Sequence, residues 1–348
     1  MSQPGGKKGA GKAPPKGEKN EESNGTAKAG ATKEAKDKEE TSSNPDGDET
    51  PSSKPQSAGA NVRDAAQRIL TLCQKAEWAP IDQILKSMEK AISNAGEDAH
   101  TTPLAGIADL PTGMTPLMYA VKDNRTSLLD RMIDLGSDVG ARNNDNYNVL
   151  HISAMHSRED VVKLLLGKKG VDPYSTGGSR NQTAVHLVAS RQTGTATAIL
   201  RALLQAAGKD IRLKVDGRGK VPLLLAVEAG NQSMCRELLS TLTSEQLKAA
   251  AANGDTALHL AVRRKDIDMV RILVDYGTNV DIRNGEGQAP LHIAAAEGDE
   301  ILVKYFYGVR ASASITDNQD RTPMHLAAEN GHANIIGKQQ FPLPNLIY

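Results

Sequence analysis

The chain has 348 residues, with 42 basic and 42 acidic side chains and only two cysteines. A net charge of zero gives no long-range attraction to nucleic acid or to an anionic membrane, and no apolar run approaches the roughly 18 residues of a membrane span. Two cysteines far apart in the sequence favour a reducing compartment over a disulfide framework. We therefore expect a cytoplasmic protein with no direct membrane insertion.

The first 58 residues form a low-complexity segment. Up to residue 60 the sequence contains no Val, Ile, Leu, Phe, Tyr, Trp or Cys, and ten lysines balance ten acidic residues. Such a segment cannot bury enough apolar surface to offset the entropy lost on ordering. We predict that residues 1–58 form a disordered tail.

Residues 59–108 carry the pattern of a pair of helices. Val62, Ile69 and Cys73 share one helix face, and Pro80 suits the first turn of a second helix. A repeat protein needs a cap on the exposed apolar end of its first repeat. We predict that residues 59–108 form a helical capping region.

A four-residue motif recurs seven times after this region. Its copies follow one another at steps of 33, 35, 38, 35, 33 and 33 residues, and a period near 33 with the pattern T-P-L-H is typical of ankyrin repeats. We predict an all-α ankyrin-repeat solenoid of helix–turn–helix repeats with β-turn fingers over 109–336, with six complete repeats, a truncated seventh, and a non-repeat tail at 337–348. The copies are Thr115-Pro-Leu-Met118, Asn148-Val-Leu-His151, Thr183-Ala-Val-His186, Val221-Pro-Leu-Leu224, Thr256-Ala-Leu-His259, Ala289-Pro-Leu-His292 and Thr322-Pro-Met-His325.

The residue two places before each copy is the sharpest local signal. Only Gly, Asn and Asp occur there, and these residues best tolerate a positive φ. We predict a tight turn at each of these positions, which are Gly113, Asn146, Asn181, Gly219, Gly254, Gly287 and Asp320.

Five histidines recur at the fourth motif position, and we predict a structural role for them. Successive repeats lie on the order of 10 Å apart, so two such histidines cannot both reach one metal ion at about 2 Å. We expect each ring to join backbone groups of its own turn and of the neighbouring repeat, aided by the hydroxyl where Thr begins the motif. They are His151, His186, His259, His292 and His325.

No pattern in the sequence predicts an enzyme. Gly217-Arg-Gly-Lys220 lacks the spacing and the Ser/Thr of a phosphate-binding loop, and no nucleophile is paired with a base. We expect no catalytic residue, no metal site and no cofactor. An enzyme remains a remote alternative.

Several stretches closely resemble the first repeats of the no-mechanoreceptor-potential-C (TRPN) branch of transient receptor potential channels. They include Asn143-Asn-Asp-Asn-Tyr-Asn-Val-Leu-His151 and Lys304-Tyr-Phe-Tyr-Gly-Val-Arg-Ala-Ser-Ala-Ser314, and the resemblance covers roughly 58–336. It implies a cytoplasmic ankyrin solenoid at the inner face of the plasma membrane. It also implies association with microtubules or other cytoskeletal elements, and with other channel subunits.

The seventh repeat departs from this resemblance. Gly337 weakens its second helix, and Pro342 and Pro344 prevent the helix from resuming. We interpret the chain as a fragment of a longer channel, from an incomplete gene model. The alternative is a free adaptor or competitor from a shortened transcript, in which an apolar tail caps the last repeat. That tail contains Phe341, Leu343, Leu346 and Ile347.

The leading functional prediction is a non-enzymatic protein-binding scaffold that transmits force. Its partners are expected to contact the turn fingers and the concave face built from the first helices. The finger residues expected to contact a partner are Asp145, Tyr147, Arg180, Arg218, Glu286, Asp317 and Gln319.

Overall fold

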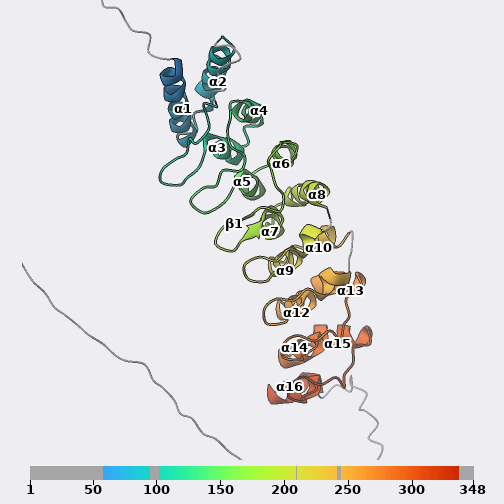
Figure 1. The fold of residues 1–348 in the computed structure, drawn as a ribbon. Coiled ribbons are helices and arrows are strands. Elements are labelled where there is room, and N and C mark those ends of the chain that lie inside the picture. Colours follow the sequence, from blue (N-terminus) through green and yellow to red (C-terminus); the bar gives the residue numbers. More distant parts are fainter. Residues whose placement is uncertain (1–57, 95–101, 209, 241–243, 337–348) are drawn as a thin grey trace, which may run out of the picture. The chain divides into compact units, whose positions relative to one another are not determined.

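The computed structural model describes residues 58–94, 102–208, 210–240 and 244–336. The predicted tail at 1–58, apart from its last residue, and the predicted apolar cap at 337–348 therefore lie outside the described residues. The regular secondary structure of the described residues is almost entirely helical, as predicted, and the helices recur with the repeat period of the sequence (Figure 1).

Each of the seven repeats contains a short first helix and a second helix that packs beside it. The first helices form one layer of the stack and the second helices form the other (Figure 1). The first helices are α3 (Pro116–Lys122), α5 (Val149–His156), α7 (Ala184–Ala189), α9 (Pro222–Glu228), α12 (Ala257–Arg263), α14 (Pro290–Ala296) and α16 (Pro323–Glu329). The second helices are α4 (Thr126–Asp134), α6 (Glu159–Leu166), α8 (Ala196–Ala207), α10 (Gln232–Leu239), α13 (Ile267–Asp275), α15 (Glu300–Gly308) and α17 (Ala333–Ile336).

The motif begins each first helix because its first residue is the N-cap. That residue has an extended backbone in every repeat, for example φ −82° and ψ 160° at Thr115. The Thr115 hydroxyl accepts a hydrogen bond from the Met118 amide, which satisfies one of the amides left free at a helix start. In four repeats the next residue is proline, which suits the first helical position.

The third motif position supplies the core of the stack. It is at most 1 % exposed in the first six repeats, and burying one such aliphatic side chain stabilises the fold by about 1.5–3 kcal/mol. In the seventh repeat Met324 is only partly buried. The six buried residues are Leu117, Leu150, Val185, Leu223, Leu258 and Leu291.

Two longer helices precede the first repeat, α1 (Ala58–Gln74) and α2 (Trp78–Asn94). Helix α1 packs on α3 and α2 packs on α4, so the pair continues the two layers of the stack. Ile69, Ile81 and Leu85 are fully buried and share one hydrophobic cluster with the first repeat. Trp78 is anchored by its indole N–H, which donates to Asp123 at 3.1 Å.

The middle of the stack is irregular, which explains the repeat steps longer than 33 residues. Helix α8 has 12 residues, and a 3-10 helix, η1 (Asp210–Leu213), follows it. A further short helix, α11 (Ser244–Lys248), precedes the fifth repeat. A two-stranded antiparallel hairpin, β1 (Thr176–Gly177) with β2 (Gln182–Thr183), forms the turn of the third repeat.

Candidate functional site

Seven loops project from one edge of the stack, each just before a first helix (Figure 1). We call these loops fingers 1 to 7 and define each as the five residues before the motif. They are residues 110–114, 143–147, 178–182, 216–220, 251–255, 284–288 and 317–321. Their geometry decides which side chains a partner can reach.

A tight turn shapes every finger. All seven residues two places before the motif have positive φ, from 48° at Asn181 to 81° at Gly254. This is the backbone conformation that the residue types predict, since Gly, Asn and Asp adopt it with the least strain.

Side chains at the base hold three of the fingers closed. Asp216, Asn284 and Asp317 each use one side-chain oxygen to accept two backbone N–H groups of their own finger, at 2.9–3.0 Å. The backbone N–H of the same residue donates to the last carbonyl of the finger. The base of each of these fingers is therefore a rigid hydrogen-bonded loop.

Backbone hydrogen bonds also join neighbouring fingers. Asn144 N–H donates to Thr112 O at 2.9 Å, and Gly217 N–H donates to Arg180 O at 2.6 Å. Fingers 5 to 7 are joined in the same way. Arg142, which directly precedes finger 2, donates to Asn146 O in that finger and to Thr176 O, which lies just before finger 3. Direct backbone bonds therefore fix the spacing of finger 1 to 2, 3 to 4, 5 to 6 and 6 to 7.

The recurring histidines join the repeats. In His186 the Nδ1 atom accepts the N–H of Thr183 at 3.2 Å, and Nε2 lies 3.1 Å from Lys220 O of the next repeat. Since Nδ1 accepts, Nε2 carries the hydrogen and donates it. His151, His259 and His292 make the same inter-repeat contact at 2.9–3.0 Å. His325 is exposed, and no described carbonyl lies across its Nε2.

Burial keeps the four inner histidines neutral. It lowers the pKa of His151 to about 4, and it also lowers the pKa of His186, His259 and His292. In the unfolded chain these rings have a pKa near 6.5. The unfolded state therefore takes up protons first as the pH falls.

We expect the stability of the chain to decline as the pH falls from about 6.5 toward 4. The histidine contribution is complete above pH 6.5 and is lost as the pH drops through the lowered folded pKa values. The midpoint of urea unfolding, measured by circular dichroism between pH 7.5 and 4.5, checks this expectation. A His151→Gln variant is expected to show a shallower decline, and a midpoint that is independent of pH would contradict the mechanism.

Five of the seven predicted partner residues lie at exposed finger tips. No described residue forms a side-chain hydrogen bond or ion pair with any of them, so their polar groups are available to another molecule. They are Asp145, Arg180, Arg218, Glu286 and Gln319.

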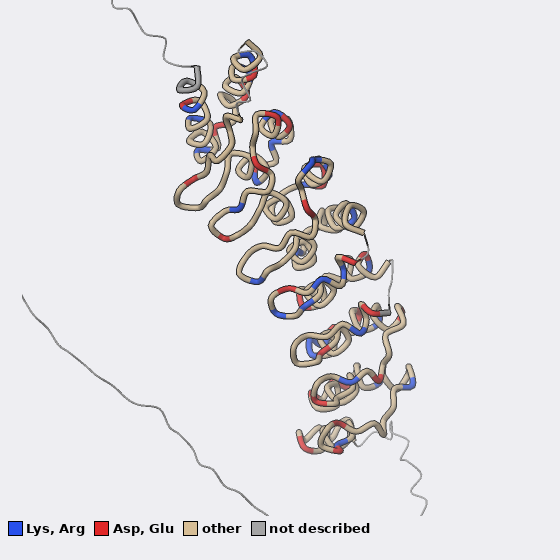
Figure 2. The backbone as a smooth tube through the Cα atoms, viewed as in Figure 1, with Lys and Arg blue, Asp and Glu red and all other residues tan. Residues whose placement is uncertain are grey.

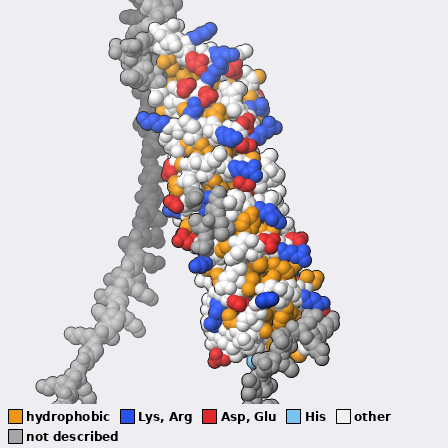
Figure 3. All heavy atoms as spheres, turned by 90° about the vertical axis from the view of Figure 1, so that its right-hand side faces the viewer, with side chains coloured by type: hydrophobic (Ala, Val, Ile, Leu, Met, Phe, Trp, Pro, Cys, Tyr) orange, Lys and Arg blue, Asp and Glu red, His pale blue; other side chains and the backbone are white. Residues whose placement is uncertain are grey.

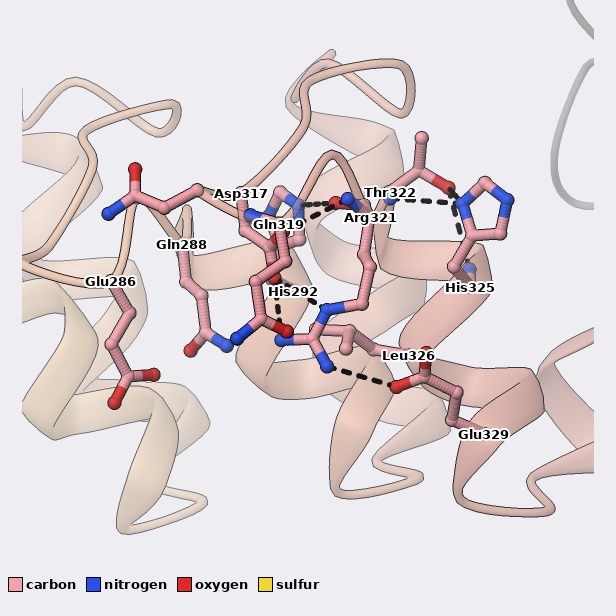
Figure 4. Close-up of polar contacts among 12 residues, drawn as sticks. Glu286, Gln288, His292, Asp317, Gln319, Arg321, Thr322, His325, Leu326 and Glu329 are labelled. Carbon is pink, nitrogen blue, oxygen red and sulfur yellow. Dashed lines mark hydrogen bonds and ion pairs between the residues drawn. The ribbon is translucent and has the colours of Figure 1, made fainter.

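Asp317, also predicted to contact a partner, does not lie at an exposed finger tip. Its side chain is only 3 % exposed and its carboxylate closes finger 7 from within (Figure 4). Burial alone would raise its pKa, but hydrogen bonds from Arg321 and from the finger backbone outweigh that effect and hold the pKa at about 2. Asp317 is needed to shape the finger that presents Gln319.

Tyr147 is also largely used within the fold. Its ring is partly buried, lies 5.7 Å from the His151 ring, and packs over Gly178, where a Cβ would come within 2.3 Å of the Tyr147 hydroxyl. It forms the wall of a groove of about 360 Å³ between fingers 2 and 3. The groove is lined by Asn144, Asp145, Asn146, Tyr147, Gly178 and Ser179.

Ion pairs along the first helices were not predicted from the sequence. In three repeats the last finger residue pairs with a residue eight positions later, at the end of the first helix. Opposite charges eight residues apart in the sequence could have indicated these ion pairs. The pairs are Lys220–Glu228, Asp255–Arg263 at 3.0 Å and Arg321–Glu329 at 3.1 Å (Figure 4 shows the last).

The side of the stack formed by the second helices carries charges of both signs (Figure 3). Several of them pair along one helix, as in Lys163–Glu159 at 2.6 Å and Lys304–Glu300 at 2.5 Å. Part of the charge on this side is thus neutralised by pairing within a helix.

Neither cysteine of the chain is a reactive thiol. Burial raises the pKa of both Cys73 and Cys235 to about 12, which makes these thiols poor nucleophiles. Within the described ranges, no three His, Cys, Asp or Glu residues are grouped so as to hold a metal ion. None of the helices described here has both the length and the apolar character to cross a membrane.

The architecture is that of a helical repeat scaffold. The family profile "Ankyrin repeats (3 copies)" matches residues 83–177, 185–284 and 276–337, which together exceed half of the chain. The chain therefore belongs to the ankyrin-repeat family.

Two known proteins are each similar to about half of this chain. Human transient receptor potential cation channel subfamily A member 1 is 28 % identical over 176 residues, which is 49 % of this chain and 15 % of the channel. The chicken nuclear factor NF-kappa-B p105 subunit is 26 % identical over 173 residues, 49 % of this chain and 17 % of that protein. The chain thus spans less than a fifth of the length of either relative.

The fold is shared with a solved ankyrin domain. The crystal structure of the Bcl-3 ankyrin repeat domain superposes with a TM-score of 0.59 at 27 % identity, covering 65 % of this chain and 99 % of that one.

Proposed function

We propose that this chain is the cytoplasmic N-terminal ankyrin region of a TRPN-like mechanosensitive cation channel. In this proposal the fingers bind a cytoskeletal partner, and the repeats transmit force from that partner along the stack to the rest of the channel. The resemblance of residues 143–151 and 304–314 to that branch supports the proposal. So does the 28 % identity to a human transient receptor potential channel.

The observation that carries the binding role is the set of exposed finger tips on one edge of the stack. No described residue pairs with the side chains of five of these tip residues, whereas many charges on the first and second helices are paired. The five are Asp145, Arg180, Arg218, Glu286 and Gln319. Ankyrin repeats mediate protein–protein interaction, so an edge of unpaired polar groups is where a partner would bind.

The recurring histidines support the force-transmitting part of the proposal. Four inter-repeat contacts of 2.9–3.1 Å each join a motif histidine to the last finger carbonyl of the next repeat, and they are missing at the steps through Met118 and Leu224. A pull on one finger therefore acts directly on the backbone of the next repeat.

Sedimentation with microtubules tests the partner. We expect the full 348-residue chain to pellet with taxol-stabilised microtubules and to remain in the supernatant without them. Failure to pellet, together with failure to associate with other domains of a TRPN channel, would contradict the proposal.

A free-standing adaptor is the second candidate. It is favoured by the superposition that covers 99 % of the Bcl-3 ankyrin domain, because an ankyrin region of this size exists there as a folded unit. The mass of the native protein separates the two candidates. An adaptor would have the 37.0 kDa mass of this chain, and the channel would be several times larger.

A further inference from the structure

Two unpaired arginines occupy equivalent positions on adjacent fingers. Arg180 in finger 3 and Arg218 in finger 4 each lie three residues before the motif, and both are exposed. No described residue forms a hydrogen bond or an ion pair with either guanidinium. The arginines at the finger bases differ, because Arg142 donates to Thr176 O and Arg283 donates to Gly287 O.

The backbone holds this pair at a fixed separation. Gly217 N–H donates to Arg180 O at 2.6 Å, so the two fingers are directly joined. A Cβ at Gly217 would lie 2.9 Å from the same carbonyl oxygen, which leaves no space for a side chain there. Asp216, only 5 % exposed, accepts the Arg218 N–H at 2.9 Å. A rigid site loses less conformational entropy when it binds.

Charges of opposite sign lie on both sides of the pair. The equivalent finger position is Asp145 in finger 2 and Glu286 in finger 6, and Asp320 lies at the tip of finger 7. In Figure 2, basic segments mark the loops before α7 and α9, and acidic segments mark the loops before α14 and α16. At the position three residues before the motif, the finger edge therefore carries arginine only in fingers 3 and 4.

This charge pattern indicates which kind of partner would bind. We propose that Arg180 and Arg218 form a docking site for an extended acidic segment of a partner protein. An extended segment advances about 3.3 Å per residue, so carboxylates two to four residues apart span the roughly 10 Å between neighbouring repeats. Arginine is suited to bidentate recognition of carboxylates.

The carboxylates of Asp145 and Glu286 fix where along the fingers an acidic segment can bind, and they disfavour a nucleic acid. A polyanion with a phosphate on every unit would meet Asp145 or Glu286 as soon as it extended past the arginine pair. A protein segment can place neutral or basic residues there, and like charges facing each other suppress wrong partners.

Fluorescence anisotropy with a labelled peptide of three Glu-Ser-Glu-Gly repeats tests this site, at about 50 mM salt where screening is weak. We expect the full chain to bind this peptide and not the peptide in which Gln replaces Glu. The Arg180→Gln/Arg218→Gln variant should bind at least about tenfold more weakly, which corresponds to about 1.4 kcal/mol. Circular dichroism melting of each variant confirms that it is folded.

The matched control is Arg63→Gln/Arg236→Gln, which removes the same charge from exposed arginines on α1 and α10. It should bind the Glu peptide like the unmodified chain. Three results would overturn the inference: no binding of the Glu peptide, equal losses in both double variants, or tighter binding of single-stranded RNA that is lost in the Arg180→Gln/Arg218→Gln variant.

This inference rests on the proposed protein-binding role of the fingers, and the two can fail separately. Microtubule sedimentation of the unmodified chain tests the proposed role. If the Arg180→Gln/Arg218→Gln variant lost no peptide affinity while the unmodified chain still pelleted, the inference would be wrong and the proposed function would stand.

Discussion

Replacing His186 by alanine is expected to lower the free energy of unfolding by about 4 kcal/mol. The imidazole is fully buried and is bonded to two backbone groups, Thr183 N–H and Lys220 C=O. The substitution leaves both groups without their partner, at about 1–3 kcal/mol each, and also leaves a cavity between repeats three and four. Urea unfolding followed by circular dichroism measures the loss.

His325→Ala is the matched control for this prediction. His325 occupies the same motif position and accepts the Thr322 N–H at 3.1 Å, but it is exposed and bonds no described carbonyl of a further repeat. We expect a loss of less than about 1 kcal/mol. Equal losses for His186→Ala and His325→Ala would show that the inter-repeat bond is not what the histidines contribute.

Gly254→Ala is expected to destabilise the chain by at least about 3 kcal/mol. Gly254 has φ +81°, and a Cβ there would lie 2.1 Å from Gly285 N in the next finger. The positive φ alone costs a non-glycine residue about 1–2 kcal/mol. The clash with backbone adds to this cost, because the finger has to move and weaken the hydrogen bond from Gly285 N–H to Asn253 O.

A Gly219→Ala variant separates the cost of the positive φ from the cost of the steric clash. Gly219 occupies the same turn position with φ +73°, but a Cβ added there would meet no atom within 4 Å. We expect a loss of only about 1–2 kcal/mol, from the backbone conformation alone. Thermal melting of both variants measures the difference, and a Gly254→Ala variant as stable as Gly219→Ala would show that the fingers do not constrain each other.

The repeat architecture could be predicted because it depends on local chemistry that recurs. Each motif places an N-cap, an aliphatic core residue and usually a histidine at set positions, and each turn carries Gly, Asn or Asp. These preferences act within a few residues, so they can be read in one copy and checked in six others. The inter-repeat role of His151 followed from the same periodicity.

The direction in which each finger side chain faces could not be predicted from the sequence. Asp317 and Gln319 are two residues apart on one loop, yet one is 3 % exposed and the other is exposed. The carboxylate of Asp317 turns inward because two backbone N–H groups and Arg321 converge on it. Sequence position places both residues on a finger, but it does not say which way each side chain faces.

The sequence by itself determined the fold class and the turn positions, because these depend on contacts within a repeat. Only the tertiary structure decided which charges are paired and which remain available. Lys220, close in sequence to Arg218, pairs with Glu228, whereas no described residue pairs with the guanidinium of Arg218. Such pairings depend on distances across a folded finger and helix, and these distances exist only once the repeats have stacked.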